Sequence, residues 1–297
     1  MADSKNGPDL GKAFKQFREA RGYTLKEAGF GTSVSALSRF EHDQTNLNNH
    51  ALNTVMTNIG LLPDDLRVDF LMFHSPFIKA LGNIKALRVG VSLERVKSAA
   101  DQYRVTTADH DYPLRELNIA VFDWMIKSYE ANAELRMPSD LQAQIKHLLI
   151  DDNAWYMYDL NIFSFVMDFL DTNLIVRAYQ SLRAHEHFKL GTPYADDIAF
   201  VMWHVGLALI MRDENELLPT VQEDIIRFRD AMTDRQGPLI SNLVLALVIE
   251  KKEPSVANSA RVAKALRAPT MIGMPNLASF CQLLVSKAHG VEAGVII

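Results

Sequence analysis

The sequence has one cysteine among its 297 residues, only 14 glycines and 11 prolines, and no long uncharged apolar run. A lone cysteine cannot form an internal disulfide, so we interpret Cys281, which is flanked by apolar residues, as a buried structural thiol rather than a redox sensor. Few glycines and prolines leave little room for long disordered stretches. No apolar run reaches the roughly 18 residues that span a membrane.

The amino terminus shows no sign of a secretion signal. Residues 1–7 are polar and lack the apolar core of a signal peptide. We therefore expect a cytoplasmic protein without a membrane partner.

Basic residues are not in excess, which does not favour a nucleic-acid binder at first sight. The net charge is −5, and residues 1–62 carry seven basic against six acidic side chains, a balance of +1. Charge alone therefore does not indicate DNA binding, and the argument must rest on the residue pattern.

Apolar residues recur at helical spacing along almost the whole chain, and no run alternates with period two long enough to form a sheet. The sequence thus predicts an all-α protein with a small domain over residues 1–66 and a large one over 67–297. In the large domain, antiparallel helical pairs joined by short turns suggest hairpins similar to tetratricopeptide repeats, although their strict consensus is absent. An irregular helical bundle is the alternative.

The small domain contains the signals of four short helices. Gly22 ends the first at a position that favours left-handed backbone. Thr24-x-x-Glu27 is a capping box for the second, and Gly29-Phe30-Gly31 breaks it. Ser33 caps a third helix that runs through Glu41, and a fourth ends at Gly60. Two short helices around a glycine-containing turn are typical of a helix-turn-helix that places its second helix in the major groove.

The third helix has two distinct faces. Leu37 and Phe40 point one way, toward the domain interior, and small polar residues with one arginine point the other way. Arg39 can bond both acceptors of a guanine edge, and Val34 can contact a thymine methyl group. We predict DNA contacts from this exposed face, formed by Val34, Ser35, Ser38, Arg39 and His42.

Phosphate contacts are predicted at the helix ends, where short polar residues and backbone amides favour anions. Thr24 and Lys26 begin the second helix, and Thr45 follows the third between Gln44 and Asn46. We also predict an ion pair between Arg18 and Glu41 that keeps the first and third helices in register, as a specificity device more than a large stabiliser.

Residues 10–61 resemble the phage-repressor (XRE-type) helix-turn-helix domain. More narrowly, the segment LGKAFKQFREARGYTLKEAGFGTSVSALSRFEHDQTNL resembles the Rgg family of Gram-positive quorum-sensing regulators, with SALSRFE at residues 35–41 as its most specific part. WYMYDLNIF at residues 155–163 resembles an element of that family's carboxyl-terminal domain. The two segments occur in the family's order, in a chain of the family's length.

Three positions depart from the family pattern. Leu25 stands where such domains usually carry a phosphate-contacting Gln, and His42-Asp43 replaces Arg-Gly after the third helix. Asp43 must then adopt the left-handed conformation, which Asp does at modest cost. Because His42 is mostly neutral at pH 7, we expect weaker phosphate affinity, for which dimerisation compensates.

The resemblance implies that the large domain forms a homodimer and binds a short hydrophobic signalling peptide on its concave face. Asn242, a polar residue in an apolar helix, is the first candidate for the groove, and helix phase adds Asn83, Asp168 and Arg177. Trp203 lies in AFVMWHVGLALIM, which is apolar on nearly all sides. That segment is interpreted either as part of an adaptable binding surface or as a fully buried central helix.

Neither a cofactor, a metal nor an enzymatic activity is indicated. His185-Glu186-His187 lacks the spacing of a metal motif, Gly29-x-Gly31 is no dinucleotide fingerprint, and no catalytic arrangement is evident. The sequence predicts a peptide-responsive transcription factor. The alternatives are a helix-turn-helix regulator sensing a small molecule or, through His42, His185 and His187, pH, and a helical-repeat interaction scaffold without DNA binding.

Overall fold

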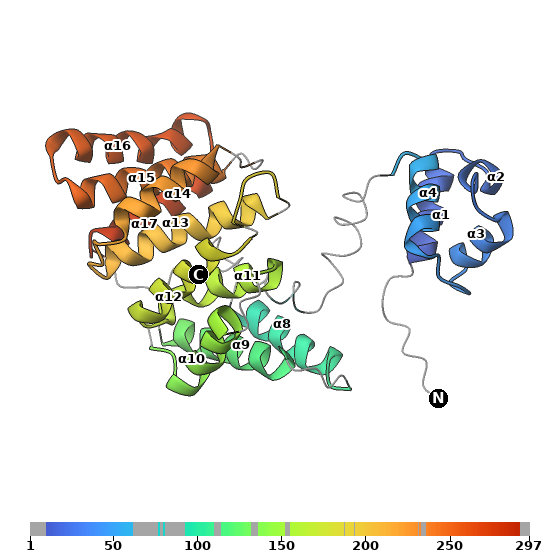
Figure 1. The fold of residues 1–297 in the computed structure, drawn as a ribbon, viewed down its shortest axis with the longest axis horizontal. Coiled ribbons are helices and arrows are strands. Elements are labelled where there is room, and N and C mark those ends of the chain that lie inside the picture. The colour runs from blue at the N-terminus through green and yellow to red at the C-terminus, as the bar shows by residue number, and fades with distance from the viewer. Residues whose placement is uncertain are drawn as a thin grey trace. The chain divides into compact units, whose positions relative to one another are not determined.

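The structure is a computed structural model. It describes residues 10–61, 93–109, 114–131, 136–151, 155–186, 188–192, 194–230 and 236–291, and residues 77, 80 and 232, with Tyr129 as backbone only. This described part of the chain is all-α, as predicted, and contains no strand (Figure 1).

The helices are α1 (Leu10–Ala20), α2 (Leu25–Ala28), α3 (Val34–Glu41), α4 (Asn49–Asn58), α8 (Leu93–Thr106), α9 (Leu114–Glu130), α10 (Ser139–Lys146), α11 (Met157–Val166), α12 (Thr172–Ala184), α13 (Ala195–Met211), α14 (Leu218–Arg229), α15 (Gly237–Lys252), α16 (Val256–Met271) and α17 (Pro275–Ala288). A π-helical turn, η3 (His147–Asp151), continues α10, and a 3-10 turn, η4 (Met167–Phe169), continues α11.

The chain divides into two compact units, residues 1–83 with 101–109, and residues 84–100 with 110–297. The predicted domain boundary after residue 66 lies outside the described residues.

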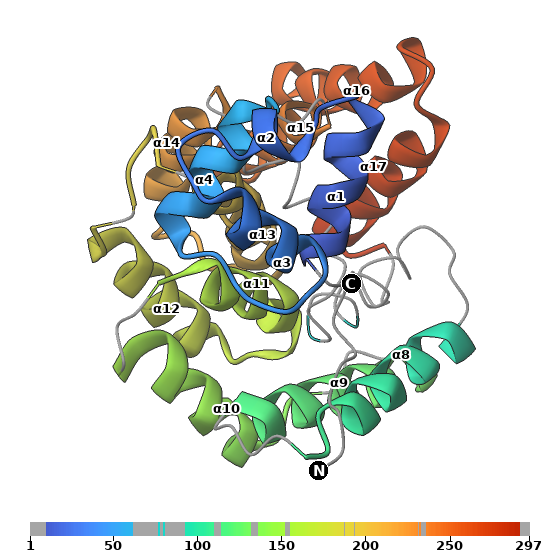
Figure 2. The ribbon, with the colours of Figure 1, turned by 90° about the vertical axis from the view of Figure 1, so that its right-hand side faces the viewer.

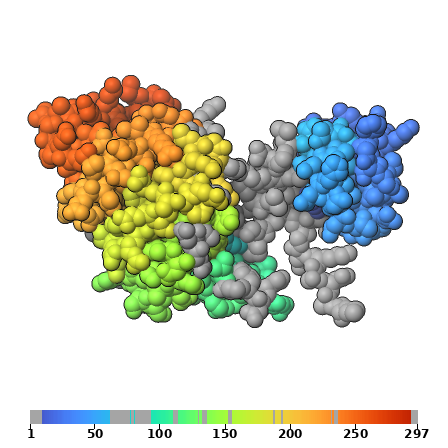
Figure 3. Space-filling view, viewed as in Figure 1, coloured from blue at the N-terminus to red at the C-terminus, as the bar shows by residue number. Residues whose placement is uncertain are grey.

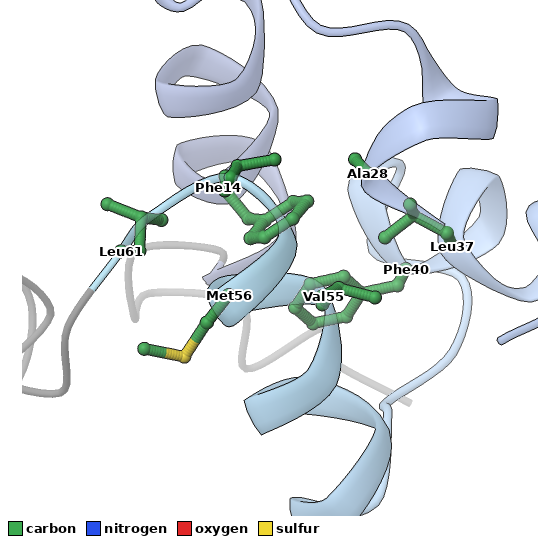
Figure 4. Close-up of a cluster of buried hydrophobic side chains, with 8 residues drawn as sticks. Phe14, Ala28, Leu37, Phe40, Val55, Met56 and Leu61 are labelled. Atoms are coloured by element: carbon green, nitrogen blue, oxygen red, sulfur yellow. The ribbon is translucent and has the colours of Figure 1, made fainter. Parts of the chain in front are cut away.

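The core of the first unit is formed by one apolar face of each of its short helices. Phe14 of α1 packs against Phe40 of α3 with their ring centroids 6.0 Å apart. Ala28, Leu37 and Val55 complete the centre of the cluster (Figure 4). All of these side chains are buried, so the orientation of α3 is set by what lies beneath it.

Three helices of this unit, α1, α3 and α4, end in the same way, with one residue in left-handed backbone. Gly22 and Gly60 have φ of 74° and 67°, and Asp43 has φ of 57°. At each of them, backbone N–H groups bond to carbonyls three and five residues earlier, as in a Schellman motif. The predicted left-handed Asp43 is therefore confirmed, and Lys12 lies 3.1 Å from its carboxylate.

Helices α1 and α3 approach each other closely at a glycine. A Cβ atom on Gly11 would lie 1.8 Å from the carbonyl oxygen of Phe40. Only a residue without a side chain therefore fits at this crossing, and the backbone of α3 rests directly on α1.

The second unit is a stack of helical hairpins. Consecutive helices from α12 to α17 contact each other, and alternate helices α11, α13, α15 and α17 also contact one another in turn. Figure 2 shows α10, α12 and α14 following one another along one side of the unit. In the space-filling view the colour of this unit changes steadily from green to red, so neighbours in space are neighbours in sequence (Figure 3). This is the arrangement of a helical-repeat solenoid, as predicted.

Helix α13 is the centre of this unit, in contact with α11, α12, α14, α15 and α17. It is buried on all sides over most of its length. A Cβ atom on Gly206 would lie 3.2 Å from side-chain atoms of both Ile225 and Val244, so α14 and α15 close tightly over it. The fully buried central helix, one of the two interpretations of this segment, is the one observed.

Cys281 is a buried free thiol on α17, and burial raises its pKa to about 11. The protonated form therefore dominates near neutral pH, which fits a structural thiol and opposes a redox role.

We predict that Gly11→Ala destabilises the first unit, although Gly→Ala within a helix ordinarily stabilises by about 0.5–1 kcal/mol. The added methyl group collides with backbone, so we expect a loss of about 1–3 kcal/mol or more. Hydrogen exchange of the α3 amides would measure it. Gln16→Ala, at an exposed position of the same helix, is the matched control and should leave exchange unchanged; equal protection in both variants would contradict the close approach.

Candidate nucleic-acid interface and effector site

The exposed face of α3 consists of the residues predicted to contact DNA. Val34 is 43% exposed, Ser35, Arg39 and His42 are exposed, and Ser38 is partly buried. On the opposite face, Leu37 is fully buried and Phe40 nearly so. Within the described part of the chain, Arg39 has neither an ion pair nor a hydrogen-bond partner. Its guanidinium is therefore available to a ligand.

Local hydrogen bonds fix the polar side chains around Arg39. His42 Nδ1 lies 2.7 Å from the carbonyl oxygen of Ser38, so this nitrogen carries the proton. The hydroxyl groups of Ser33 and Ser35 lie 2.7 Å apart, and Ser33 also accepts from the backbone N–H of Ala36 at the start of α3. The face is thus partly ordered before any ligand binds.

The residues predicted to hold phosphate differ in whether their side chains already make hydrogen bonds within the protein. Lys26 and Thr45 are exposed. The hydroxyl of Thr24, however, accepts from the backbone N–H of Glu27 and donates to its carboxylate at 2.7 Å. The Glu27 carboxylate also accepts from the backbone N–H of Thr24 at 2.8 Å, and this bond, together with that from the hydroxyl, lowers the pKa of Glu27 and keeps it charged. A negative charge at the start of α2 opposes a phosphate there, so Lys26 is the stronger candidate.

Arg18 and Glu41 form the predicted ion pair. Arg18 Nε and Nη2 donate to the two carboxylate oxygens of Glu41 at 2.6 and 2.7 Å, and both residues are buried, at 7% and 1% exposed. Arg18 Nη1 also donates to the carbonyl oxygen of Tyr23 at 2.8 Å. The hydrogen bond to Glu41 raises the pKa of Arg18. One side chain thus connects α1, the turn after it and the end of α3.

Asn58 is a positioning residue that the sequence analysis missed. Its side-chain amide donates to the carbonyl oxygens of Ala28 and Phe30 at 2.8 and 2.7 Å, which fixes the turn between α2 and α3 to α4. The only signal in the sequence was a polar amide near the end of an amphipathic helix, and its partners lie about 30 residues away.

The second unit has a pocket of about 240 Å³ between α11 and α13, two of the alternate helices that stack on one another. Polar and apolar residues line it together: Leu160, Asn161, Ser164, Asp196, Asp197, Phe200 and Met232. Both aspartates lie in the first turn of α13, where negative charge also suits the helix dipole.

The residues predicted to bind peptide are not brought together in this pocket. Trp203 is fully buried behind Phe200, with ring centroids 5.0 Å apart, and so belongs to the core of this structure rather than to an open surface. Arg177 is exposed on α12, and Asp168 is partly buried in η4. Asn242 is exposed on α15 and accepts from Arg229 at 3.0 Å. Asn83 lies outside the described residues.

Neither a metal-binding cluster nor a membrane-spanning helix is present in the described ranges. They contain no group of three residues that could hold a metal ion, and His187 lies outside them. No described helix combines the length and the apolar character that crossing a membrane requires.

This chain is similar to known proteins in its fold and not in its sequence. No protein-family model and no curated protein matches the sequence. Solved structures do match. A Listeria monocytogenes EGD-e protein put forward as a transcriptional regulator is 14% identical, with 95% of this chain and 97% of that chain covered and a TM-score of 0.75. The Streptococcus dysgalactiae SHP pheromone receptor Rgg2 is 12% identical, with 94% and 100% covered and a TM-score of 0.69. PrgX in complex with cCF10 is 13% identical, with 97% and 94% covered and a TM-score of 0.70.

The fold therefore defines an all-α protein with a phage-repressor-like helix-turn-helix unit and a helical-repeat unit. Within that class, the chain has the fold of the SHP pheromone receptor Rgg2 and of PrgX over nearly its whole length. The predicted structural resemblance is confirmed, at an identity that shows fold alone.

We predict that Glu41→Gln destabilises the first unit by about 3–5 kcal/mol, because it leaves the Arg18 charge buried without its partner. Chemical denaturation would measure this loss of stability, and hydrogen exchange of the amides in α1 and α3 would show that it affects the first unit. The double variant Arg18→Met, Glu41→Leu removes both charges and should recover most of the loss. If the single and double variants are equally unstable, the ion pair does not act as described.

Proposed function

We propose that this protein is a sequence-specific DNA-binding transcriptional regulator controlled by a short peptide. The proposal rests on the two faces of α3. Leu37 and Phe40 are buried and hold the helix in place. Arg39, on the other face, is exposed and has no ion-pair or hydrogen-bond partner in the described part of the chain. An arginine presented among small polar side chains can approach a base edge and bond guanine with two parallel hydrogen bonds.

DNA binding would use two copies of the first unit. The weak basic balance of residues 1–62 provides few phosphate contacts per copy. A homodimer doubles these contacts and places two α3 helices on half-sites about 34 Å apart, one helical turn of DNA. We assign DNA binding to residues 1–66, and dimerisation and sensing to residues 67–297.

The peptide would bind on the second unit. Proteins with the same fold include PrgX in complex with cCF10 and the SHP pheromone receptor Rgg2. The α11–α13 pocket combines apolar Leu160 and Phe200 with the carboxylates of Asp196 and Asp197, which suits an apolar peptide with a cationic group such as a free amino terminus.

These features support a regulator rather than an enzyme, acting in the cytoplasm where its DNA target lies. The interaction-scaffold alternative predicts negligible DNA affinity at any salt concentration, whereas a regulator predicts affinity that falls steeply with salt.

We predict that Arg39→Ala relaxes sequence preference at one base pair per half-site, at a cost of about 1–3 kcal/mol. Lys26→Ala should instead weaken binding to all sequences equally and reduce the slope of log affinity against log salt by about one. Fluorescence anisotropy would separate the two effects. It would be measured with an operator selected from random DNA sequences and with single-base variants of that operator, at several salt concentrations. Unchanged base preference in Arg39→Ala would refute the assignment of α3 as the recognition helix.

We predict that the double variant Asp196→Asn, Asp197→Asn weakens binding of the effector peptide tenfold or more, because it removes charge-assisted hydrogen bonds. Synthetic peptides encoded by short open reading frames beside the gene would serve as probes in isothermal titration calorimetry. Asp140→Asn, in the first turn of α10, is the matched control. An N-acetylated peptide has no charged amino terminus and should bind the wild type and the double variant with the same affinity. If the unmodified peptide also binds both with the same affinity, this pocket is excluded as its site.

A further inference from the structure

A second pocket lies on α12 and α14, away from the α11–α13 pocket. Its volume is about 370 Å³, and its lining residues are Gln180, Arg183, Ala184, Phe188 and Arg227. Two of the five are arginines, and none of the described residues that line the pocket is acidic. Nothing in the proposed DNA or peptide binding uses this site.

Arg183 is oriented by a buried network. The carboxylate of Asp224 on α14 is 3% exposed and accepts a hydrogen bond from the hydroxyl of Tyr179 at 2.6 Å. Arg183 Nε lies 2.7 Å from the same carboxylate oxygen. Burial and the contact with Asp224 raise the pKa of Tyr179, so its hydroxyl remains a donor. A single carboxylate engages at most two of the five N–H donors of Arg183, so the remaining donors can face a ligand.

Arg227 is held by aromatic rings instead of a carboxylate. Its guanidinium carbon lies 5.6 Å from the ring centroid of Phe188 and 5.2 Å from that of Phe228. The two rings themselves pack with centroids 4.9 Å apart. Among the described residues, no carboxylate pairs with Arg227. Stacking orders the side chain while every one of its five N–H donors stays available.

We propose that this pocket is a binding site for a small oxyanion, a carboxylate or phosphate group carried by a small-molecule ligand. Arginine presents donors in a planar fork that matches both groups, and two such forks converge on one pocket. Asp224, the carboxylate that contacts Arg183, is buried and engaged by Tyr179 and Arg183. Gln180 adds a neutral amide that can donate to the same anion.

Binding there would connect neighbouring hairpins of the solenoid. Arg183 belongs to α12 and Arg227 to α14, so an anion held by both joins the hairpin of α12 to the hairpin of α14. The site is independent of the proposed regulator function and would operate in a scaffold equally well.

Isothermal titration calorimetry on the full chain tests the proposal, with inorganic phosphate and citrate as probes and sodium chloride at matched ionic strength as the blank. We expect saturable binding of at least one probe to the wild type. Arg227→Gln should weaken it tenfold or more, since hydrogen bonds to charged groups are lost. Arg267→Gln, at an exposed position of α16 outside the pocket, is the matched control and should bind as the wild type does.

The two probes distinguish the sources of the anion, since preference for phosphate indicates a phosphorylated ligand and preference for citrate a carboxylate. Arg183→Lys keeps a positive charge beside Asp224 but loses the fork, and should also weaken binding while the thermal unfolding midpoint stays close to that of the wild type. No saturable binding of either probe at millimolar concentration, or equal binding by Arg227→Gln and Arg267→Gln, would overturn the proposal.

Discussion

The contact on which the first unit depends is the seam between α1 and α3. Gly11 lets the two backbones meet at the carbonyl of Phe40, and the buried Arg18–Glu41 pair fixes how far α3 can slide or rotate along that seam. Apolar packing of Phe14 on Phe40 alone would tolerate small shifts, because hydrophobic contact is not directional. A bidentate ion pair is directional, and its cost of desolvation is repaid only in good geometry. The position of Arg39 on the surface follows from this constraint.

Local features of the first unit were predictable because their causes lie within a few residues of sequence. Three such features are the capping box at Thr24, the cap at Ser33 and the left-handed Asp43. Each depends on hydrogen bonds between residues that are close in sequence, so the local residue pattern predicts it. The two faces of α3 follow from helical periodicity in the same way. The Arg18–Glu41 pair spans 23 residues, yet helix phase sufficed, because each partner stands beside an aromatic residue that packs in the same core. Asn58 offered no such marker.

The candidate effector site was far less predictable, and α13 shows the physical reason. A helix that is apolar on all sides carries no periodicity from which an inner and an outer face could be read. Trp203 was therefore compatible with a groove as well as with a core. Asn242 illustrates the opposite difficulty, since a polar residue in an apolar helix here reaches the surface and meets Arg229. Pocket residues such as Asn161 and Asp196 come from helices more than 30 residues apart, and only the stacking of alternate helices brings them together.

The same central helix limits how a ligand can change this protein. Because α13 touches α11, α12, α14, α15 and α17, a ligand that alters the spacing of α11 and α13 must also disturb at least one other interface. At Gly206 the side chains of Ile225 and Val244 pack so closely that they leave little room for even a methyl group. Such close-packed apolar interfaces shift between discrete arrangements rather than deform continuously. A peptide in the α11–α13 pocket would thus act on the stack as a whole. The Tyr179–Asp224–Arg183 network links α12 to α14 and is a polar contact that such a rearrangement must either preserve or break.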